Sequence, residues 1–424
     1  MNTAVEGWGN IDFGNLIVLI RNGFSGKQVG WITEYPVTRI ETISNGMIDP
    51  TKVGYVEKIP GSYLLRTGDI LFSNINSLKH IGKAAQVKNG TYLFHGMNLL
   101  VFRSSDDIDV NFLFFKLIEA KPWFEKMATQ AVNQASINQT TIKELQLHIP
   151  ASKPEQSKIA EVLSKVDQAI EQTESLIAKQ QRIKTGLMQD LLTRGIDEHG
   201  NLRSEETHDF KDSPLGRIPV EWELFTVDSL GEVVTGSTPS TSVENYYDGD
   251  IMFVSPKDIS NTSELITQTE KTLSPSGLSV CRAIPVNSIC TVCIGSTIGK
   301  IGLTKSQCAT NQQINTLIPY ISEDAEMLLF AMRLFLRPQL RREAGLQAVP
   351  IVNKALFSKM ILPFSADPDE KTRARTVLSA ASSQIDAQIA YSEKLRSLKT
   401  ALMQDLLTGK KRVTPLIENI EVCS

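Results

Sequence analysis

A ten-residue segment occurs twice in this 424-residue chain and restricts its possible folds more than any other feature. Residues 184–193 read KTGLMQDLLT and residues 399–408 read KTALMQDLLT, so one position differs between two segments that lie 215 positions apart. Chance does not readily produce such a match, and a repeat has to be recognised before a fold is assigned. The sequence therefore predicts a duplicated unit, with one of these segments at the end of each copy.

The repeat extends upstream through residues 155–195 and 370–410, which are helix-like and have no proline or glycine in their long central parts. In both copies, mainly apolar residues recur at alternating steps of four and three, and two polar members fall at matching places, Thr173 with Gln388 and Lys184 with Lys399. A 3.5-residue period is typical of a narrow seam that packs against another helix. The first seam consists of Ile159, Leu163, Val166, Ile170, Thr173, Ile177, Gln180, Lys184, Leu187 and Leu191, and the second of Ala374, Leu378, Ala381, Ile385, Gln388, Ser392, Leu395, Lys399, Leu402 and Leu406.

Two such helices in one chain most simply pair with each other. At 1.5 Å per residue each helix is expected to be roughly 60 Å long. A rod of that length contributes little to a compact core and instead holds two parts of a protein apart. The alternative is an ordinary long helix packed on its own domain, but the repeat, the shared seam and the length together favour a paired-helix spacer.

The segments before the two helices show the same features in the same order. A helix predicted over residues 325–342 corresponds to one over 111–126, and a Gly-Lys pair at 299–300 corresponds to one at 82–83. The sequence between the shared features differs, which suits two modules of one fold that contact different targets. The strand-like runs of the first segment are residues 16–20, 37–43, 69–73, 84–87 and 99–102.

Six consecutive parts are predicted from these boundaries, and a polar, irregular stretch separates the two copies. The parts are a first globular domain (1–152), a first spacer helix (153–196), a surface linker (197–216), a second globular domain (217–366), a second spacer helix (367–412) and a tail (413–424).

The composition indicates a soluble globular protein, with 41% hydrophobic and 21% charged residues. No run of 18 apolar residues and no signal-peptide pattern occurs, so a cytoplasmic location is expected. The net charge of −3 and a pI near 6.1 argue mildly against a free-standing nucleic-acid binder, which is usually basic. Local basic patches, or phosphate contacts supplied by a partner, are compatible with these values.

The five cysteines all lie in the second half of the chain, and Cys290 and Cys293 form a CxxC motif with Cys281 and Cys308 nearby. A zinc site is one interpretation. The corresponding part of the first copy, around residues 71–76, has no cysteine, so the shared fold is expected to form without metal. A disulfide is not expected in a cytosolic protein.

The sequence offers no catalytic motif. GSTIGK at residues 295–300 has three residues between its glycines and Ile301 after the lysine, whereas a phosphate-binding P-loop has four residues there and a following Ser or Thr. No GxGxxG follows a strand, and the five histidines make no ligand spacing. Asp367 and Asp369 more simply stabilise a helix N-terminus. No catalytic residue, metal or bound cofactor is therefore predicted.

The order of the motifs resembles one family over nearly the whole chain. GRIPVEWE at residues 216–223 precedes GSTP at 236–239, GSTIGK, and NQQI at 311–314, and a helix ends in LMQDLLT. This arrangement is similar to the specificity subunit of a type I restriction-modification system. The second copy carries the motifs more fully, because the first lacks the GxIPxxW opening.

The resemblance implies an α+β fold with two similar mixed α/β target recognition domains. Two long antiparallel helices, packed as a coiled coil, would join them in a pseudo-twofold internal repeat. Each domain would read one half of a split double-stranded DNA site, and the helices would set the gap between the halves. The chain would be non-catalytic, with two methyltransferase subunits carrying S-adenosylmethionine and with restriction/translocase subunits in the same complex. Two copies of one partner can dock alike on a half-repeat, and Val162, Leu176, Ile183, Val377 and Leu398 are candidates for that contact.

Side chains at or beside turns are the candidates for DNA binding. Arg and Lys suit phosphates and guanine edges, and Asn and Gln suit adenine edges. Gly82-Lys83 and Gly299-Lys300 recur at matching places, so they serve the shared fold or sequence-independent phosphate contacts as readily as base reading. The amide-rich segment 134–139 is a further candidate. The candidates are Lys27, Arg39, Asn74, Asn76, Lys79, Lys83 and Asn98 in the first domain, and Lys257, Ser296, Thr297, Lys300, Lys305, Asn311, Gln312 and Gln313 in the second.

A second hypothesis belongs to a different functional class. Two protein-binding modules on a coiled-coil spacer, with no role in DNA recognition, would also explain the repeat. The acidic pI supports this alternative.

Overall fold

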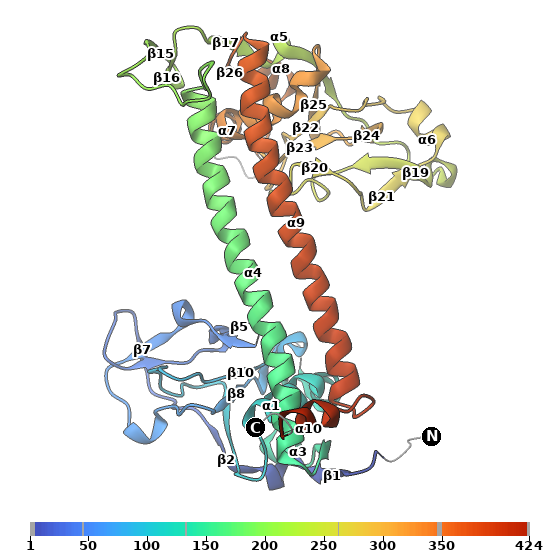
Figure 1. Cartoon of the computed structure of the whole chain (residues 1–424). Helices are drawn as coiled ribbons and strands as arrows, with labels where there is room; N and C mark the ends of the chain where they lie inside the picture. Colours follow the sequence, from blue (N-terminus) through green and yellow to red (C-terminus); the bar gives the residue numbers. More distant parts are fainter. Residues whose placement is uncertain (1–4, 45, 132–133, 262, 346–349, 422–424) are drawn as a thin grey trace. The chain divides into compact units, whose positions relative to one another are not determined.

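The computed structural model describes residues 5–44, 46–131, 134–261, 263–345 and 350–421 (Figure 1). These residues form two compact units. The first unit combines residues up to 172 with those from 392 onwards, and the second consists of residues 173–391. Each unit therefore contains one globular domain and parts of both long helices.

The long helices are α4 (Lys153–Thr193) and α9 (Pro368–Leu406). Each begins with a proline in its first turn, where a missing N–H has no intrahelical partner to lose. In each unit the two helices run antiparallel side by side (Figure 1) and share a hydrophobic core. All twenty predicted seam positions are buried or partly buried, so the seam predicted from the 3.5-residue period is confirmed.

The globular part of the first unit is built on a four-stranded antiparallel sheet with the order β10-β8-β11-β2. Two helices, α1 (Val110–Glu119) and α2 (Lys121–Met127), follow the sheet, and α1 contacts β10. An aromatic core joins these layers, since the Phe72 ring centroid lies 5.0 Å from Phe102 and 4.8 Å from Phe124. The strands are β2 (Ile17–Asn22), β8 (Ile70–Phe72), β10 (Ala84–Gln86) and β11 (Leu100–Ser104).

The second unit repeats this sheet. Its order is β18-β25-β22-β23-β20, and the first four strands correspond to β2, β11, β8 and β10 in the same spatial sequence. A fifth strand, β20 (Leu265–Ile266), adds to β23 in parallel. Helix α7 (Ala325–Ala344) packs against β23 in the place of α1 and α2. The predicted α+β class with an internal repeat is thereby confirmed. The four shared strands are β18 (Gly231–Thr235), β22 (Ile289–Val292), β23 (Ile301–Thr304) and β25 (Ile314–Pro319).

A second matching pair of strands leads into each long helix. In the first unit β1 (Trp8–Asp12) pairs with β14 (Gln146–Pro150), and in the second β17 (Glu223–Thr226) pairs with β26 (Ile361–Phe364). The smaller elements of the first unit are β3 (Gln28–Val29), β4 (Pro36–Val37), β5 (Ile43–Ser44), β6 (Met47–Ile48), β7 (Gly54–Val56), β9 (Ile75–Asn76), β12 (Thr129–Ala131), β13 (Gln134–Ser136), α3 (Gln139–Lys143) and α10 (Thr414–Glu421). Those of the second are β15 (Phe210–Ser213), β16 (Gly216–Pro219), α5 (Val227–Leu230), β19 (Tyr247–Val254), β21 (Lys271–Leu273), α6 (Pro275–Ser279), β24 (Cys308–Thr310) and α8 (Lys354–Lys359).

Three local predictions were wrong in detail. The single strand predicted over residues 37–43 is two short strands around a turn of 3-10 helix, in which the Arg39 N–H donates to Thr42 Oγ1 at 2.8 Å. The helix predicted over 111–126 is two helices, because Pro122 cannot donate within a continuous helix and instead stands in the first turn of α2. The predicted irregular linker contains β15, which forms a hairpin with β16.

A buried glutamate at the start of each long helix forms an ion pair with an arginine, at equivalent positions in the two units. In the first unit the buried carboxylate of Glu155 accepts from Arg412 Nε at 2.6 Å and Nη2 at 2.8 Å. In the second unit the buried Glu370 accepts from Arg203 and from Trp222 Nε1. Each arginine lies in the segment that follows the other long helix, so each unit is fastened by residues from two separate parts of the chain.

The cysteines of the second unit are part of its core. Cys290, Cys293 and Cys308 are buried, and burial raises the pKa of Cys293 to about 12. Among the described residues, no three His, Cys, Asp or Glu side chains come together as a group able to hold a metal ion. Within the same described ranges, every helix is too short or too polar to cross a membrane.

Candidate nucleic-acid interface

One edge of the shared sheet carries most of the polar candidates in each unit. In the first unit Phe72 of β8 lies opposite Leu100 of β11, so the residues after β8 and those before β11 meet at this edge. In the second unit Val292 of β22 lies opposite Ile314 of β25 in the same manner. The corresponding residues are 73–76 and 97–98 in the first unit, and 293–297 and 311–313 in the second.

A glycine brings a further loop to this edge in both units. Gly23 follows β2, and a Cβ there would lie 1.8 Å from the Gly96 carbonyl oxygen. Gly236 follows β18, and a Cβ there would lie 2.2 Å from the Asn311 carbonyl oxygen. Because no other residue fits against the neighbouring backbone, the glycine of the GSTP motif is explained by this close approach. The first unit keeps the same packing although it lacks that motif.

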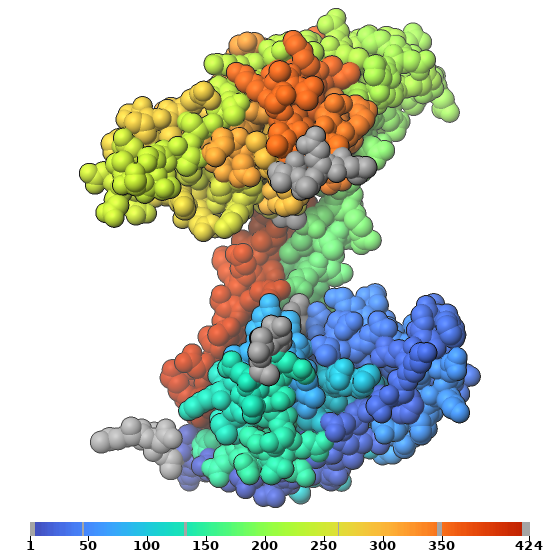
Figure 2. Space-filling model, turned by 180° about the vertical axis from the view of Figure 1, so that it is seen from behind, coloured from blue at the N-terminus to red at the C-terminus, as the bar shows by residue number. Residues whose placement is uncertain are grey.

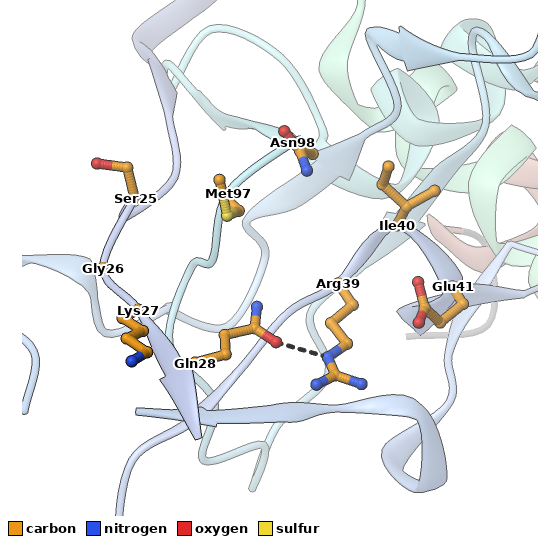
Figure 3. Close-up of a pocket in the computed structure, with 9 residues that line it drawn as sticks. All are labelled: Ser25, Gly26, Lys27, Gln28, Arg39, Ile40, Glu41, Met97 and Asn98. Carbon is orange, nitrogen blue, oxygen red and sulfur yellow. Dashed lines mark hydrogen bonds between the residues drawn. The ribbon is translucent and has the colours of Figure 1, made fainter. Parts of the chain in front are cut away.

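An open pocket of about 460 Å³ lies at the edge in the first unit (Figure 3). Three of the predicted residues, Lys27, Arg39 and Asn98, line it. They come from the loop before β3, from the start of the 3-10 turn, and from the loop before β11. The remaining lining residues are Ser25, Gly26, Gln28, Ile40, Glu41 and Met97.

The chemistry of this pocket is set by Arg39 and Gln28. Arg39 Nε donates to Gln28 Oε1 at 2.7 Å, which orients the guanidinium plane and uses one of the two lone pairs of the Gln28 amide oxygen. What remains is donor-rich, because both the terminal guanidinium nitrogens and the Gln28 amide group carry N–H bonds. Such donors suit the O6 and N7 acceptors of guanine or a phosphate oxygen. The exposed carboxylate of Glu41 adds an acceptor on the same pocket.

A second pocket of about 240 Å³ adjoins the first, since Ile40 and Glu41 line both. Two predicted residues, Asn76 and Lys83, line it. Burial, and then the charges of Lys83, Lys79 and Lys121, lower the pKa of His80 in this pocket. The three lysines place positive charge around this pocket in a chain whose net charge is negative, and positive charge suits an anion such as a phosphate. The other lining residues are Ile43, Ser44, Lys52 and Ser73.

The amide side chains of the second unit bind one another. Asn311 Nδ2 donates to Gln313 Oε1 at 3.0 Å, and Gln313 Nε2 donates to the Ile294 carbonyl at 3.4 Å. Thr238 Oγ1 donates to the exposed Gln312 at 2.5 Å, which joins the GSTP loop to the NQQI loop. This hydrogen-bonded arrangement differs from the arginine-centred pocket of the first unit, although both stand on the same sheet edge.

The predicted lysines of the second unit already have partners. Lys257 Nζ lies 3.3 Å from Glu270, and Lys305 Nζ lies 2.9 Å from Glu326, so both are ion-paired. Lys300 Nζ donates to the Pro256 carbonyl at 3.1 Å. Exposed ion pairs are weak and can exchange for a phosphate partner. Ser296 is exposed and Thr297 partly buried, and both lie in the loop after β22.

The structure places the remaining predicted residues in different surroundings. Asn74 is buried and donates to the Ile137 carbonyl at 3.4 Å, so its amide holds the 134–139 segment rather than facing solvent, whereas Lys79 is exposed. Segment 134–139 also lies beside Asn76, because Ala135 of β13 pairs with it. Gly82 and Gly299 close equivalent hairpins, since their N–H groups donate to Ser73 and Val292 at 3.0 and 2.9 Å, so the glycines serve the shared fold.

Sequence reasoning missed the four further lining residues that carry a charged, amide or imidazole side chain. Gln28 and Glu41 complete the first pocket, and Lys52 and His80 contribute to the second. His80 adjoins the predicted residue Lys79, and Gln28 adjoins Lys27, so proximity was an available signal for these two. For Glu41 and Lys52 the sequence carries no signal, because only the folded loops bring them to the edge.

Together, the fold and this edge define a duplicated recognition protein, in which one scaffold presents two different polar surfaces. Residues 20–180 and 219–390 match the family model for the type I restriction modification DNA specificity domain. The chain therefore belongs to the type I restriction-modification specificity subunit family.

Known proteins agree with this assignment. A putative type I restriction enzyme MjaX specificity subunit from Methanocaldococcus jannaschii is 30% identical over 420 residues, which cover 96% of this chain and 94% of that protein. The HindI specificity subunit from Haemophilus influenzae is 28% identical over 200 residues, covering 46% of this chain and 42% of that protein. The crystal structure of a type I S subunit from M. genitalium has the same fold, with a TM-score of 0.63 at 16% identity over 94% of this chain and 96% of that one.

Proposed function

We propose that this chain recognises DNA for a type I restriction-modification complex, each globular domain reading one half of a split double-stranded site. The observation that carries the proposal is the recurrence of one sheet edge with different polar side chains. An arginine-centred pocket marks the first domain, and an amide cluster marks the second. Different side chains on equal scaffolds suit two unequal half-sites.

The paired helices are proposed to set the gap between the half-sites. Seam residues in each unit join α4 to α9, and the helices continue without a break through residues 153–193 and 368–406. A continuous helix transmits position at about 1.5 Å per residue. Helix length and register would therefore decide how far apart the two half-sites lie.

Methyltransferase subunits are proposed to dock on the exposed apolar side chains of these helices. Leu176 and Ile183 are 41% and 51% exposed on α4, and Tyr391 and Leu398 are 52% and 47% exposed on α9. The two pairs are separated by the same 215 positions as the repeat, which suits equal docking of two copies of one partner. Figure 2 shows that middle parts of both helices, coloured green and red, lie at the surface. Val377 is also exposed, whereas Val162 packs against the first unit's core and is withdrawn from this surface.

The catalytic work is assigned to the partners. S-adenosylmethionine is expected on the methyltransferase subunits, and DNA cleavage is expected from restriction/translocase subunits of the complex. This chain would supply positioning and sequence selection alone. The alternative, a protein-interaction scaffold, is distinguished by the experiment below. The shared edge of polar, partly cationic side chains favours DNA over a protein partner.

Selection of bound sequences from a random duplex pool tests the proposal. The chain is purified with its methyltransferase partner, and recovered duplexes are sequenced. Two short blocks with a constant gap are expected, together with a steep loss of binding as salt rises. A single unbroken block would show that one domain alone reads DNA. Absence of any enriched motif would exclude DNA recognition and favour the interaction scaffold.

A further inference from the structure

Two seam lysines form the same contact in both units. Lys184 of α4 and Lys399 of α9 lie 215 positions apart and interrupt otherwise mainly apolar seams. Lys184 Nζ lies 5.4 Å from the ring centroid of Phe330, and Lys399 Nζ lies 5.7 Å from that of Phe115. The two phenylalanines are also 215 positions apart, on the first helix after each sheet. The contact therefore belongs to the duplicated unit.

The second unit adds buried charges around its lysine. Lys184 is 7% exposed, and its Nζ lies 2.5 Å from Oε1 of Glu264, which directly precedes β20. The same oxygen accepts from Arg333 Nη1 of α7 at 2.9 Å. Lys184 thus links α4 to the sheet and to α7 in one place. A charge so deeply buried needs such a partner, because an unpaired buried ion is strongly destabilising.

In the first unit the seam lysine pairs with a carboxylate of the other long helix. Lys399 Nζ lies 2.6 Å from Asp167 of α4, and the lysine side chain is 23% exposed. The lysine therefore links α9 to α4 and, through Phe115, to α1. In each unit the seam lysine therefore connects one long helix to the globular domain.

An apolar seam residue packs almost equally well after a small slide or rotation, whereas an ion pair combined with a cation–π contact has a defined direction. A polar residue at one seam position is known to fix register while giving up some stability. We propose that Lys184 and Lys399 are positioning residues that fix how each recognition domain is set on its helices. This inference rests on the proposed function, because a fixed position of each domain on its helices would allow only one gap length between the half-sites.

The test uses Lys184→Met and Lys399→Met in complex with the methyltransferase partner. Both variants are expected to fold, since Glu264 keeps Arg333 as its partner and Asp167 is 36% exposed to water. The exposed lysines Lys179 and Lys394 lie on the same helices and also differ by 215 positions. Their methionine variants are matched controls for the loss of one charge.

The readout is the gap length in duplexes selected from a pool that carries both half-sites at varied separation. Wild type and the two controls are expected to select one gap. Each seam variant is expected to lower discrimination against neighbouring gaps by about tenfold and to leave both half-site sequences unchanged. Lys184→Arg, which keeps a positive charge beside Glu264 and the Phe330 ring, should retain the single gap.

A merely structural lysine would behave differently. A lower melting temperature with an unchanged single gap, in either seam variant, would overturn the inference. So would equal broadening in the Lys179 and Lys394 controls. If wild type itself selects no two-block motif, the proposed function fails, and that result is distinct from failure of the lysines to set the gap.

Discussion

Glu370 is a buried carboxylate that accepts four hydrogen bonds in the second unit, and Glu370→Gln should destabilise that unit locally, at the start of α9. The side chain is 3% exposed. One oxygen accepts from Arg203 and from the Ile196 N–H at 3.0 Å, and the other accepts from Trp222 Nε1 at 3.1 Å and Ser365 Oγ at 2.6 Å. Glutamine keeps the shape, removes the charge, and turns one acceptor into a donor that faces other donors.

The expected loss follows from what is left without a partner. Arg203 is 8% exposed, so it would remain buried without a counter-charge, a situation that destabilises by about 3–5 kcal/mol. Glu155→Gln is the matched variant in the first unit. Arg412 has a 32% exposed side chain and can be solvated, so its loss should be nearer ~1 kcal/mol. The two equivalent glutamates should therefore differ clearly in effect.

Amide hydrogen exchange measures these local openings separately in the two units. Peptides covering residues 194–204 and 366–374 should exchange faster by at least about a hundredfold in Glu370→Gln. The equivalent first-unit peptides in Glu155→Gln should change by about fivefold, and Glu198→Gln, whose side chain is 83% exposed, should change neither. An increase under about tenfold for Glu370→Gln, or equal effects of both glutamates, would refute the reasoning from burial.

Three further predictions concern recognition, spacing and pH. Arg39→Ala should weaken selection at one position of one half-site by about 1–3 kcal/mol. The control Lys143→Ala, beyond the opposite end of the same sheet, should leave the selected motif unchanged. Loss of both half-sites in Arg39→Ala would contradict separate reading by the two domains. Inserting four residues midway in α4 should lengthen the preferred gap without altering either half-site, and altered half-sites would contradict the division of labour. Burial lowers the pKa of His95 from 6.5 to about 4. The unfolded chain therefore binds a proton at higher pH than the folded chain, and up to ~3 kcal/mol of stability should be lost as pH falls from about 6.5 to about 4. His95→Gln should flatten this part of a urea-denaturation pH profile, and an unchanged slope would contradict the assignment.

The long helices and the repeat were predictable because both leave periodic signals in the sequence. The twenty seam positions predicted from the period are all buried or partly buried, and Pro122 marked the break between α1 and α2 although a single helix was predicted. The hairpin of β15 and β16 was missed because its residues are polar and lack the alternation that identifies a strand. The 3-10 turn after β4 is stabilised in part by the hydrogen bond from the Arg39 N–H to the Thr42 side chain, which no periodicity reveals.

The residue types of the candidate site were predictable from the sequence, but which of these side chains reach the surface was not. Residue type and proximity to turns selected Lys27, Arg39 and Asn98, and the fold brings these three side chains to one pocket. The same criteria also selected Asn74, which the fold buries, and passed over Glu41. A loop residue's orientation depends on long-range strand pairing, so the sequence identifies candidates and the fold decides which of them reach the surface.

The division of the chain between the two units has a consequence for how the protein is made. The second unit is one continuous stretch, residues 173–391, and all of its core is available once that stretch has been synthesised. The first unit needs Leu407 and Val413, which lie in the same core as Phe13 and are 0% and 2% exposed. The domain that leaves the ribosome first is therefore completed last, and until then its open core is the part of the nascent chain most in need of protection from aggregation.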